Sequence, residues 1–420
     1  MELKVCEKCR PLFEVLLKRI EELERRLLAY ENAHTPPSRG GFRRHYPKIE
    51  SSSGKRGAPI GHQGTTRPTP KPTETKILNL HFCPECKSQL EKQVGIEKRI
   101  IEEIPEPKPL RIIEFRISHY KCNNCRKEII PTHPELPKTG RLGNNLQSQI
   151  VLAKYEDRLP HRKIAKMLNR QYNLDLTPAT ILNVNKRVAD RLQPEYENIK
   201  IKIKKSTELN ADETGAKIDG KKHWLWLFMN AKNVLFLFRK RREAGVIKEV
   251  LGENYNGILT CDGLKAYPKI VKNIQRCWAH LLREVKFLAQ KHEGQARILY
   301  NSLHELFKIV KEKKIEYKNA ISQMQMLLET AKAYQELRKI AVLLKNGLEQ
   351  WFTCLLYPHI EPTNNRAEQQ LREFVIQRKI YSTFRSKSGP ETAQTIMSVL
   401  ATWKLRGLNP LNMLKLNLSS

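Results

Sequence analysis

The sequence predicts a multidomain α/β protein. Its 420 residues exceed the length of one small domain, and 40% of them are hydrophobic, which is enough for more than one core. Strand-like and helix-like patterns alternate over 205–290. Helix-like patterns alone fill 140–200 and 291–360, and they return within 361–420. A mixed α/β core with helical neighbours is therefore expected.

The chain is strongly basic. It has 76 Lys and Arg against 44 Asp and Glu, a net charge of +32 that is spread along the sequence. Such a distribution favours an extended polyanion, with DNA ahead of a membrane surface. No apolar stretch approaches the ~20 residues that span a bilayer. The first twenty residues carry both signs of charge, unlike a signal peptide. We therefore expect a cytoplasmic, DNA-associated protein.

A leucine-rich segment opens the chain. Over 11–31, apolar residues recur at alternating spacings of three and four, which is typical of a coiled-coil seam. They are Phe13, Leu16, Ile20, Leu23, Leu27 and Tyr30. We predict a coiled-coil helix within 1–33 that helps to pair two chains. A single amphipathic helix packed on its own domain is the alternative.

The next segment, 34–76, is rich in Pro, Gly, Ser and Thr and has few large apolar residues. Nine Lys and Arg lie between Arg39 and Lys76, against Glu50 and Glu74. This composition predicts a flexible basic linker that tracks a phosphate backbone. A merely solvated linker is the alternative.

Cysteine spacing predicts a zinc ribbon over 77–135. Six of the nine cysteines form C-x-x-C pairs, namely Cys6/Cys9, Cys83/Cys86 and Cys122/Cys125. The last two pairs flank strand-like alternation at 99–104 and 111–117, and four thiolates complete a structural tetrahedral Zn²⁺ site. Cys6/Cys9 cannot close a site alone and is expected to remain a thiol pair.

A helix-turn-helix is expected within 140–200. The amphipathic stretch 161–172 predicts one helix, and Thr177 and Pro178 are the cap and first residue of a second helix that ends near Leu192. An ordinary helical pair is the alternative. The basic residues expected to contact DNA are Arg162, Lys163, Lys186 and Arg187.

The order of elements in 205–290 is that of a ribonuclease-H-like core, closed by the helices of 361–420 and interrupted by an all-helical insertion at 291–360. Three strands come first, then a helix, a strand, a short helical turn and a strand. The expected strands are 207–212, 223–230, 234–238, 257–261 and 273–277.

Three acidic residues are the candidate catalytic groups: Asp212, Asp262 and Glu368. Asp212 and Asp262 are expected at strand ends 50 residues apart, a path that returns the second acid beside the first. Glu368 is expected on a helix, with Asn364 and Arg372 on the same exposed face. Carboxylates suit Mg²⁺ or Mn²⁺, and two such ions promote phosphoryl transfer. Singly, each acid also fits a turn, a cap or a capping box.

With these residues in view, the chain resembles transposases of the insertion-sequence-66 (IS66) family along nearly its whole length. The motifs that carry the resemblance are Lys154–Pro160, Ala211–Gly215, His223–Trp226, Cys261–Tyr267, Cys277–Arg283 and Asn364–Glu368. Lys87 follows the second cysteine of its pair where the family often has Gly. The pair Cys277 and His280 matches the family's C-x-x-H, which a buried strand-to-helix junction explains as well as a metal does.

The resemblance implies a recombinase in which Asp212, Asp262 and Glu368 bind Mg²⁺ or Mn²⁺. It would cut the ends of a mobile element and join the freed 3′-hydroxyls to target DNA. Its partners would be both DNAs, a second or further copy of the chain, and helper proteins of the same element. Arg372, Arg378 and Lys379 would contact phosphate, although a solvated helix end is the alternative. Two other functions stay open: a non-catalytic zinc and helix-turn-helix DNA-binding regulator, and a nuclease without strand transfer.

Overall fold

The computed structural model describes residues 14–20, 22–23, 68–90, 94–103, 107, 109–292 and 294–419. The chain divides into two compact units, Glu50–Arg111 and the remainder. Most of the expected coiled coil and the linker up to residue 67 lie outside the described residues, although 14–20 and 22–23 are helical.

The strands expected at 99–104 and 111–117 are wrong for the residues that are described there. All of these are irregular, and the apolar side chains of the pattern other than the half-buried Phe115 are exposed, with Ile101 at 83% and Ile112 at 91%. Alternation predicts a strand only where one face is buried, and these side chains cover no core. The short strands β1 (Tyr120–Lys121) and β2 (Glu128–Ile129) pair instead on either side of Cys122 and Cys125.

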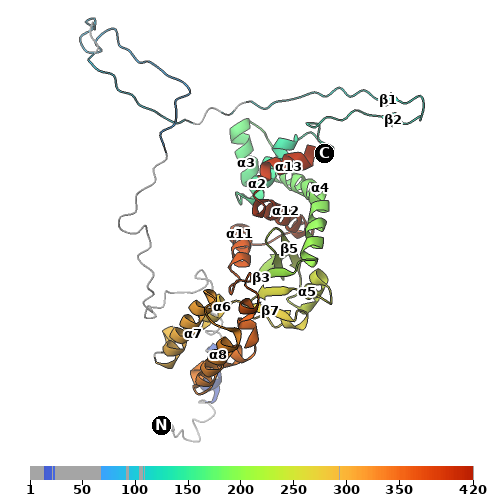
Figure 1. Ribbon diagram of the computed structural model, residues 1–420. Coiled ribbons are helices and arrows are strands. Elements are labelled where there is room, and N and C mark those ends of the chain that lie inside the picture. Colours follow the sequence, from blue (N-terminus) through green and yellow to red (C-terminus); the bar gives the residue numbers. More distant parts are fainter. Residues whose placement is uncertain are drawn as a thin grey trace. The chain divides into compact units, whose positions relative to one another are not determined.

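A five-stranded mixed sheet forms the centre of the larger unit, in the order β5-β4-β3-β6-β7 (Figure 1). The hairpin strands β3, β4 and β5 are antiparallel, and β6 and β7 run parallel to β3. Their bounds are β3 Glu208–Ile218, β4 Lys221–Met229, β5 Val234–Arg239, β6 Ile258–Cys261 and β7 Asn273–Arg276. Asp219 and Gly220 turn β3 into β4 with positive φ at both positions, as a two-residue type I′ hairpin requires.

Helix α12 (Ser388–Leu405) lies along the outer strand β5 (Figure 1). One hydroxyl or amide oxygen per helical turn accepts an outward backbone N–H of that strand. The pairs are Val234 N to Thr402 Oγ1 at 2.9 Å, Phe236 N to Ser398 Oγ at 2.8 Å and Phe238 N to Gln394 Oε1 at 3.1 Å. The side chains of α12 therefore take the place of a neighbouring strand and satisfy backbone N–H groups at the edge of the sheet.

Three N-terminal helices share one hydrophobic core with this side of the sheet. They are α2 Asn144–Tyr155, α3 His161–Tyr172 and α4 Pro178–Lys204. Thr177 caps α4 as expected, accepting from Thr180 N at 3.2 Å. The expected end near Leu192 is wrong, because α4 continues through Pro194. Buried Tyr196, Ile199 and Ile203 hold the extra turns against the core.

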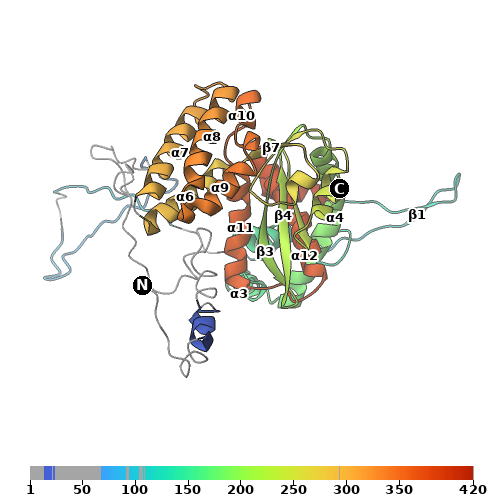
Figure 2. The ribbon, with the colours of Figure 1, turned by 90° about the horizontal axis from the view of Figure 1, so that it is seen from below.

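A second layer of helices packs around its own core, which contains Trp278, Trp351 and Phe352. It comprises α6 Trp278–Lys291, α7 Gln295–Lys311, α8 Tyr317–Lys332, α9 Arg338–Lys345 and α10 Thr353–Leu356. In Figure 2, α11 (Asn365–Tyr381) stands between this layer and strand β3. The remaining helices are α5 Ala244–Leu251 and α13 Pro410–Ser419. Among the described residues, no helix combines the length and apolar character needed to cross a membrane.

Candidate active site

Asp212 and Asp262 are brought together by the parallel pairing of β3 with β6. The ladder pairs Leu209 with Leu259 and Asn210 with Thr260. Continued by two residues, the same register sets Asp212 opposite Asp262. One carboxylate oxygen from each of Asp212, Glu213 and Asp262 lies within 4.8 Å of the other two.

The expectation that Asp212 ends its strand is wrong. β3 runs on to Ile218, because its second half pairs with β4 alone after β6 has ended at Cys261. Asp212 therefore lies where the parallel half of the sheet ends and the hairpin continues. This is the position at which a side chain on β3 faces the loop that follows β6.

Glu213, which sequence reasoning missed, is the most enclosed acid of the cluster, with 8% exposure. Its carboxylate accepts a hydrogen bond from Tyr267 Oη at 2.7 Å and from Arg242 Nε at 2.7 Å. Arg242 also lies 3.4 Å from Asp262 Oδ2. The signals available in the sequence were the adjacent acids Asp212 and Glu213 and, 54 positions after Glu213, Tyr267.

The cluster carries more negative charge than its own cation neutralises. Arg242 pairs with Glu213 and Asp262, and within the described part of the chain no cation pairs with Asp212. Burial raises the pKa of Asp212 well above its usual range, and the neighbouring charges of Glu213, Asp262 and Glu368 raise it further. Only the hydrogen bond from Glu213 N to Asp212 Oδ1 opposes this shift.

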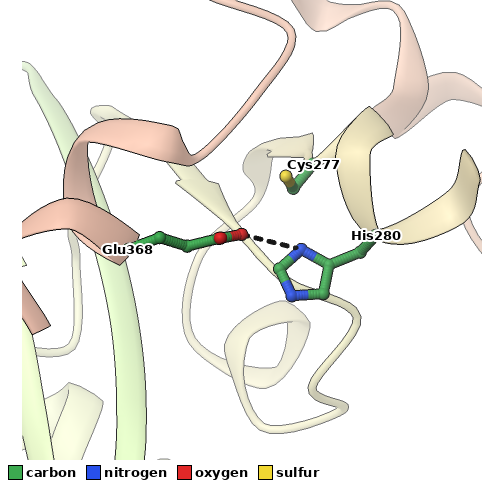
Figure 3. A group of neighbouring side chains, drawn as sticks. All are labelled: Cys277, His280 and Glu368. Carbon is green, nitrogen blue, oxygen red and sulfur yellow. Dashed lines mark ion pairs between the residues drawn. The ribbon is translucent and has the colours of Figure 1, made fainter. Parts of the chain in front are cut away.

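Glu368 belongs to a second group, with Cys277 and His280, rather than to the Asp212 cluster. Figure 3 shows Glu368 on α11 pointing toward His280 on α6. His280 Nδ1 lies 3.5 Å from Glu368 Oε1, and Arg283 lies 3.7 Å from Oε2. Among described groups, Glu368 Oε1 is buried and accepts no hydrogen bond. The carboxylate thus lies within electrostatic range of Asp212, beside His280 and the Arg283 guanidinium of α6.

Asn364 fastens the helix of Glu368 to the strand of Asp212. We expected it on the exposed face of the helix, and this is wrong, because it is fully buried. Its Nδ2 donates to the Ala211 carbonyl at 2.8 Å, and its Oδ1 accepts from Asn210 Nδ2 at 3.0 Å. Its backbone N–H donates to Cys277 Sγ at 3.1 Å. Asn364 precedes α11 without capping it, because its side chain is used across the interface.

Cys277, directly before α6, links the end of β6 to Asn364 at the start of α11. Its backbone N–H donates to the Cys261 carbonyl at 3.0 Å, directly before Asp262. Its buried thiol, whose pKa burial raises, accepts the bond from Asn364. A cavity of about 540 Å³ opens beside this junction, lined by Arg242, Asp262, Cys277 and His280 among others. Asp262 therefore faces a cavity on the side of the helical layer.

A family model described as "Transposase IS66 family" matches residues 139–392, more than half of the chain. The chain belongs to the IS66 transposase family. The matched region includes Asp212, Asp262 and Glu368 but not the four cysteines of the expected zinc ribbon. As a transposase the protein binds DNA.

Two proteins of Sinorhizobium fredii are also similar to this transposase. The uncharacterised protein y4qI is 25% identical over 77% of this chain and 69% of its own length. The uncharacterised protein y4jD is 23% identical over 72% of this chain and 68% of its own length. Neither name adds a function, so the family match carries the assignment.

The basic residues expected to contact DNA stand in different settings in this transposase. Arg162 and Lys163 are exposed in the first turn of α3, and Lys186 is exposed on α4 with the half-buried Arg187 beside it. Arg372 and Lys379 are exposed on α11. Arg378 is half-buried and donates to the Gly215 carbonyl and to Thr214 Oγ1, so it also ties α11 to β3. Their contact with DNA stays a prediction.

The two cysteine turns have the same local geometry in the transposase. Cys83 N donates to Ser88 O and Lys87 N to Cys83 O, at 2.8 and 3.0 Å. In the second turn, Cys122 N donates to Lys127 O and Arg126 N to Cys122 O, both at 2.9 Å. Lys87 and Arg126 have φ values of 62° and 60°, the conformation that favours glycine. This explains why a family member can carry Gly at the position of Lys87.

Proposed function

We propose that this transposase cuts and joins DNA at the ends of its insertion sequence by phosphoryl transfer that depends on divalent metal ions. The observation that carries the proposal is the pairing of Asp212 with Asp262 across β3 and β6, beside the helix that carries Glu368. The strand order, a three-stranded hairpin unit extended by two parallel strands, supports a ribonuclease-H-like core.

The carboxylates fit Mg²⁺ or Mn²⁺. Hard divalent cations prefer oxygen donors, and the cluster offers three carboxylates with one arginine. Asp212, Asp262 and Glu368 would hold the ions, which supply activation of the attacking oxygen and stabilisation of the leaving one. The raised pKa of Asp212 supports this reading, because a cation would favour the ionised form that burial and neighbouring acids disfavour.

Other residues of the chain would keep this cluster in place. Arg242 bridges Glu213 and Asp262, and Tyr267 fixes the second oxygen of Glu213, so the buried acid orients its neighbours. Leu264 N donates to Asp262 Oδ1 at 2.9 Å and sets the direction of that carboxylate. Asn364 keeps the start of α11 against β3. Rigid supporting bonds of this kind preserve the geometry that a transfer step needs.

We also propose that Cys83, Cys86, Cys122 and Cys125 bind one structural Zn²⁺. The matching turns support this, since each presents two thiols from a tight loop whose backbone bonds are already formed. The bonds that Cys86 makes with Ser88 lower the pKa of Cys86 to about 7, which favours the thiolate that zinc requires.

A DNA-binding regulator without catalytic activity would not need the acidic cluster of Asp212, Glu213 and Asp262. Burying three neighbouring carboxyl groups beside one arginine is costly, and DNA binding alone offers no reason for that cost. The cluster therefore favours an enzyme. A nuclease without strand transfer shares the same chemistry and differs only in its products.

The substitution Asp262→Asn tests the catalytic proposal. It removes one negative charge and preserves the shape of the side chain, so DNA-end binding should persist while cleavage falls at least about 100-fold. Cleavage and joining are measured on labelled element-end DNA with Mg²⁺ or Mn²⁺, and joined products separate a transposase from a nuclease.

Asp219→Asn is the matched control, because the exposed hairpin turn of Asp219 accepts Asn. It should leave cleavage unchanged. Wild-type cleavage by the Asp262→Asn protein would refute the catalytic assignment.

A further inference from the structure

A cavity of about 710 Å³ lies between the N-terminal helices and the loop that joins α11 to α12. It is separate from the carboxylate cluster, and none of its lining residues belongs to that cluster. Three of its lining side chains are cationic, namely Lys154, Arg162 and Arg385, and no carboxylate lines it. Within the described part of the chain, none of these three cations forms an ion pair.

Lys154 is the most notable of the three cations, because only 7% of it is exposed and a buried lysine usually has an acidic partner. Its Nζ lies 3.8 Å from the centre of the Tyr381 ring, which supplies weak cation–π stabilisation. Burial lowers the pKa of Lys154 to about 8. A lysine left in this position without a carboxylate is suited to receive an anion.

Asn185 points to the same conclusion independently. It lines the cavity with 1% exposure, and its Oδ1 has no hydrogen-bond partner among the described residues. Its Nδ2 lies 3.5 Å from His161 Nε2. An unsatisfied buried amide is costly in a folded protein, and a polar ligand would satisfy it.

The helices around the cavity add positive potential. His161 and Arg162 are the first two residues of α3, Pro178 is the first of α4, and Gly389 is the second of α12. The N-terminus of a helix presents unpaired N–H groups and the positive end of its dipole. Three helices of 12, 27 and 18 residues therefore begin at one cavity.

Four hydroxyl residues also line the cavity, namely Ser382, Thr383, Ser386 and Thr392. An apolar or aromatic wall that includes Tyr155, Leu182, Ile380 and Phe384 forms another part of the lining. We propose that the cavity binds one nucleotide of a DNA strand, with its phosphate at Lys154 and the helix N-termini and its base and sugar against the apolar wall. Asn185 would supply a polar contact to the base or sugar. Only the choice of DNA as the source of the nucleotide depends on the proposed function.

Binding of a labelled single-stranded oligonucleotide to the full chain, without added divalent ions, tests this site. Lys154→Met keeps most of the side-chain volume and removes the charge, and Arg385→Gln alters an exposed residue without disturbing packing. Each should weaken binding about tenfold, as expected for the loss of one charge-assisted hydrogen bond. The log–log salt slope should fall by about 0.7 for each phosphate that the variant no longer neutralises.

Lys318→Met on α8 is the control, because Lys318 is exposed and lies outside the cavity. It should bind as the wild type does. Asp262→Asn should also bind normally in this assay, so failure of the nucleotide site and failure of the catalytic proposal are distinguished. Thermal melting establishes that each variant is folded.

Deoxythymidine monophosphate is the second probe. If it binds and Lys154→Met abolishes that binding while oligonucleotide affinity is unchanged, the cavity serves free nucleotides, and its assignment to DNA is overturned. Unchanged affinity of both Lys154→Met and Arg385→Gln for both probes would overturn the site itself.

Discussion

At the scale of single residues, the ionised form of Asp212 is disfavoured both by burial and by the negative charge of neighbouring acids. Glu213 and Asp262 lie beside it, and the described residues supply no cation to it directly. A folded protein keeps such a position at the expense of its own stability. The acid cluster is thus a place where the apo fold is weaker than it would be with neutral side chains.

This predicts an unusual pH dependence. The raised pKa of Asp212 means that the folded chain keeps a proton that the unfolded chain releases. The free energy of unfolding should therefore fall as pH rises from about 4 through the raised pKa. Burial also raises the pKa of Glu213, so Asp212→Asn should reduce this slope without removing it, and should raise the free energy of unfolding at pH 7 by at least about 1 kcal/mol.

Urea unfolding at pH 5 and pH 7, without added divalent ions, measures both effects. Added Mg²⁺ should stabilise the wild type more than Asp212→Asn. Asp219→Asn, at an exposed turn, should show the wild-type slope. A less stable Asp212→Asn protein with the same slope would contradict the prediction.

At the scale of elements, the sequence predicted the strands and caps that are set by local burial and local hydrogen bonds. It did not predict the strand extension and the buried side chain that depend on partners far away in the sequence. The apolar runs of β4 and β5 and the cap of α4 were found within a residue or two. The second half of β3 was missed because its polar residues form a strand only through pairing with β4. Asn364 was placed on the wrong face because its partners are more than 150 positions away.

The attachment of α11 to β3 can be tested at Asn364. Asn364→Ala leaves the Ala211 carbonyl and the Asn210 amide without their partners, which costs about 1–3 kcal/mol. It also loosens the start of the helix that holds Glu368, so cleavage should fall further than stability alone explains. Urea titration and DNA cleavage are measured together.

Asn365→Ala is the neighbouring control, since Asn365 is exposed at the first position of α11. It should affect both quantities little. Equal behaviour of the two alanine variants would show that the buried amide does not fasten α11 to β3.

At the scale of the whole molecule, the chain combines a family-matched region, 139–392, with a cysteine-bearing segment that precedes it. Sequence spacing predicted the four cysteines as one zinc site, and their shared turn geometry is the support that the structure adds. The described residues of 77–135 have little apolar burial, so a metal would supply much of the folding free energy of this segment.

We therefore expect about one zinc per chain, lost on Cys86→Ser or Cys125→Ser and kept on Cys6→Ser. Chelation should expose residues near 77–135 to a protease before the region 139–392 is cut, because binding there contributes on the order of 10 kcal/mol. Metal analysis and limited proteolysis measure this. Full zinc content in the Cys125→Ser protein would contradict it.

The polar row on α12 has a further consequence for assembly. Gln394, Ser398 and Thr402 occupy the outward donors of β5, while Thr353 and Cys354 bond to β7 at the opposite margin. Within the described region, three backbone N–H groups of β5 and the Ile274 carbonyl of β7 are thus engaged at the two flanks of the sheet. We therefore expect any association between copies to use side-chain surfaces or helices rather than a strand added beside β5.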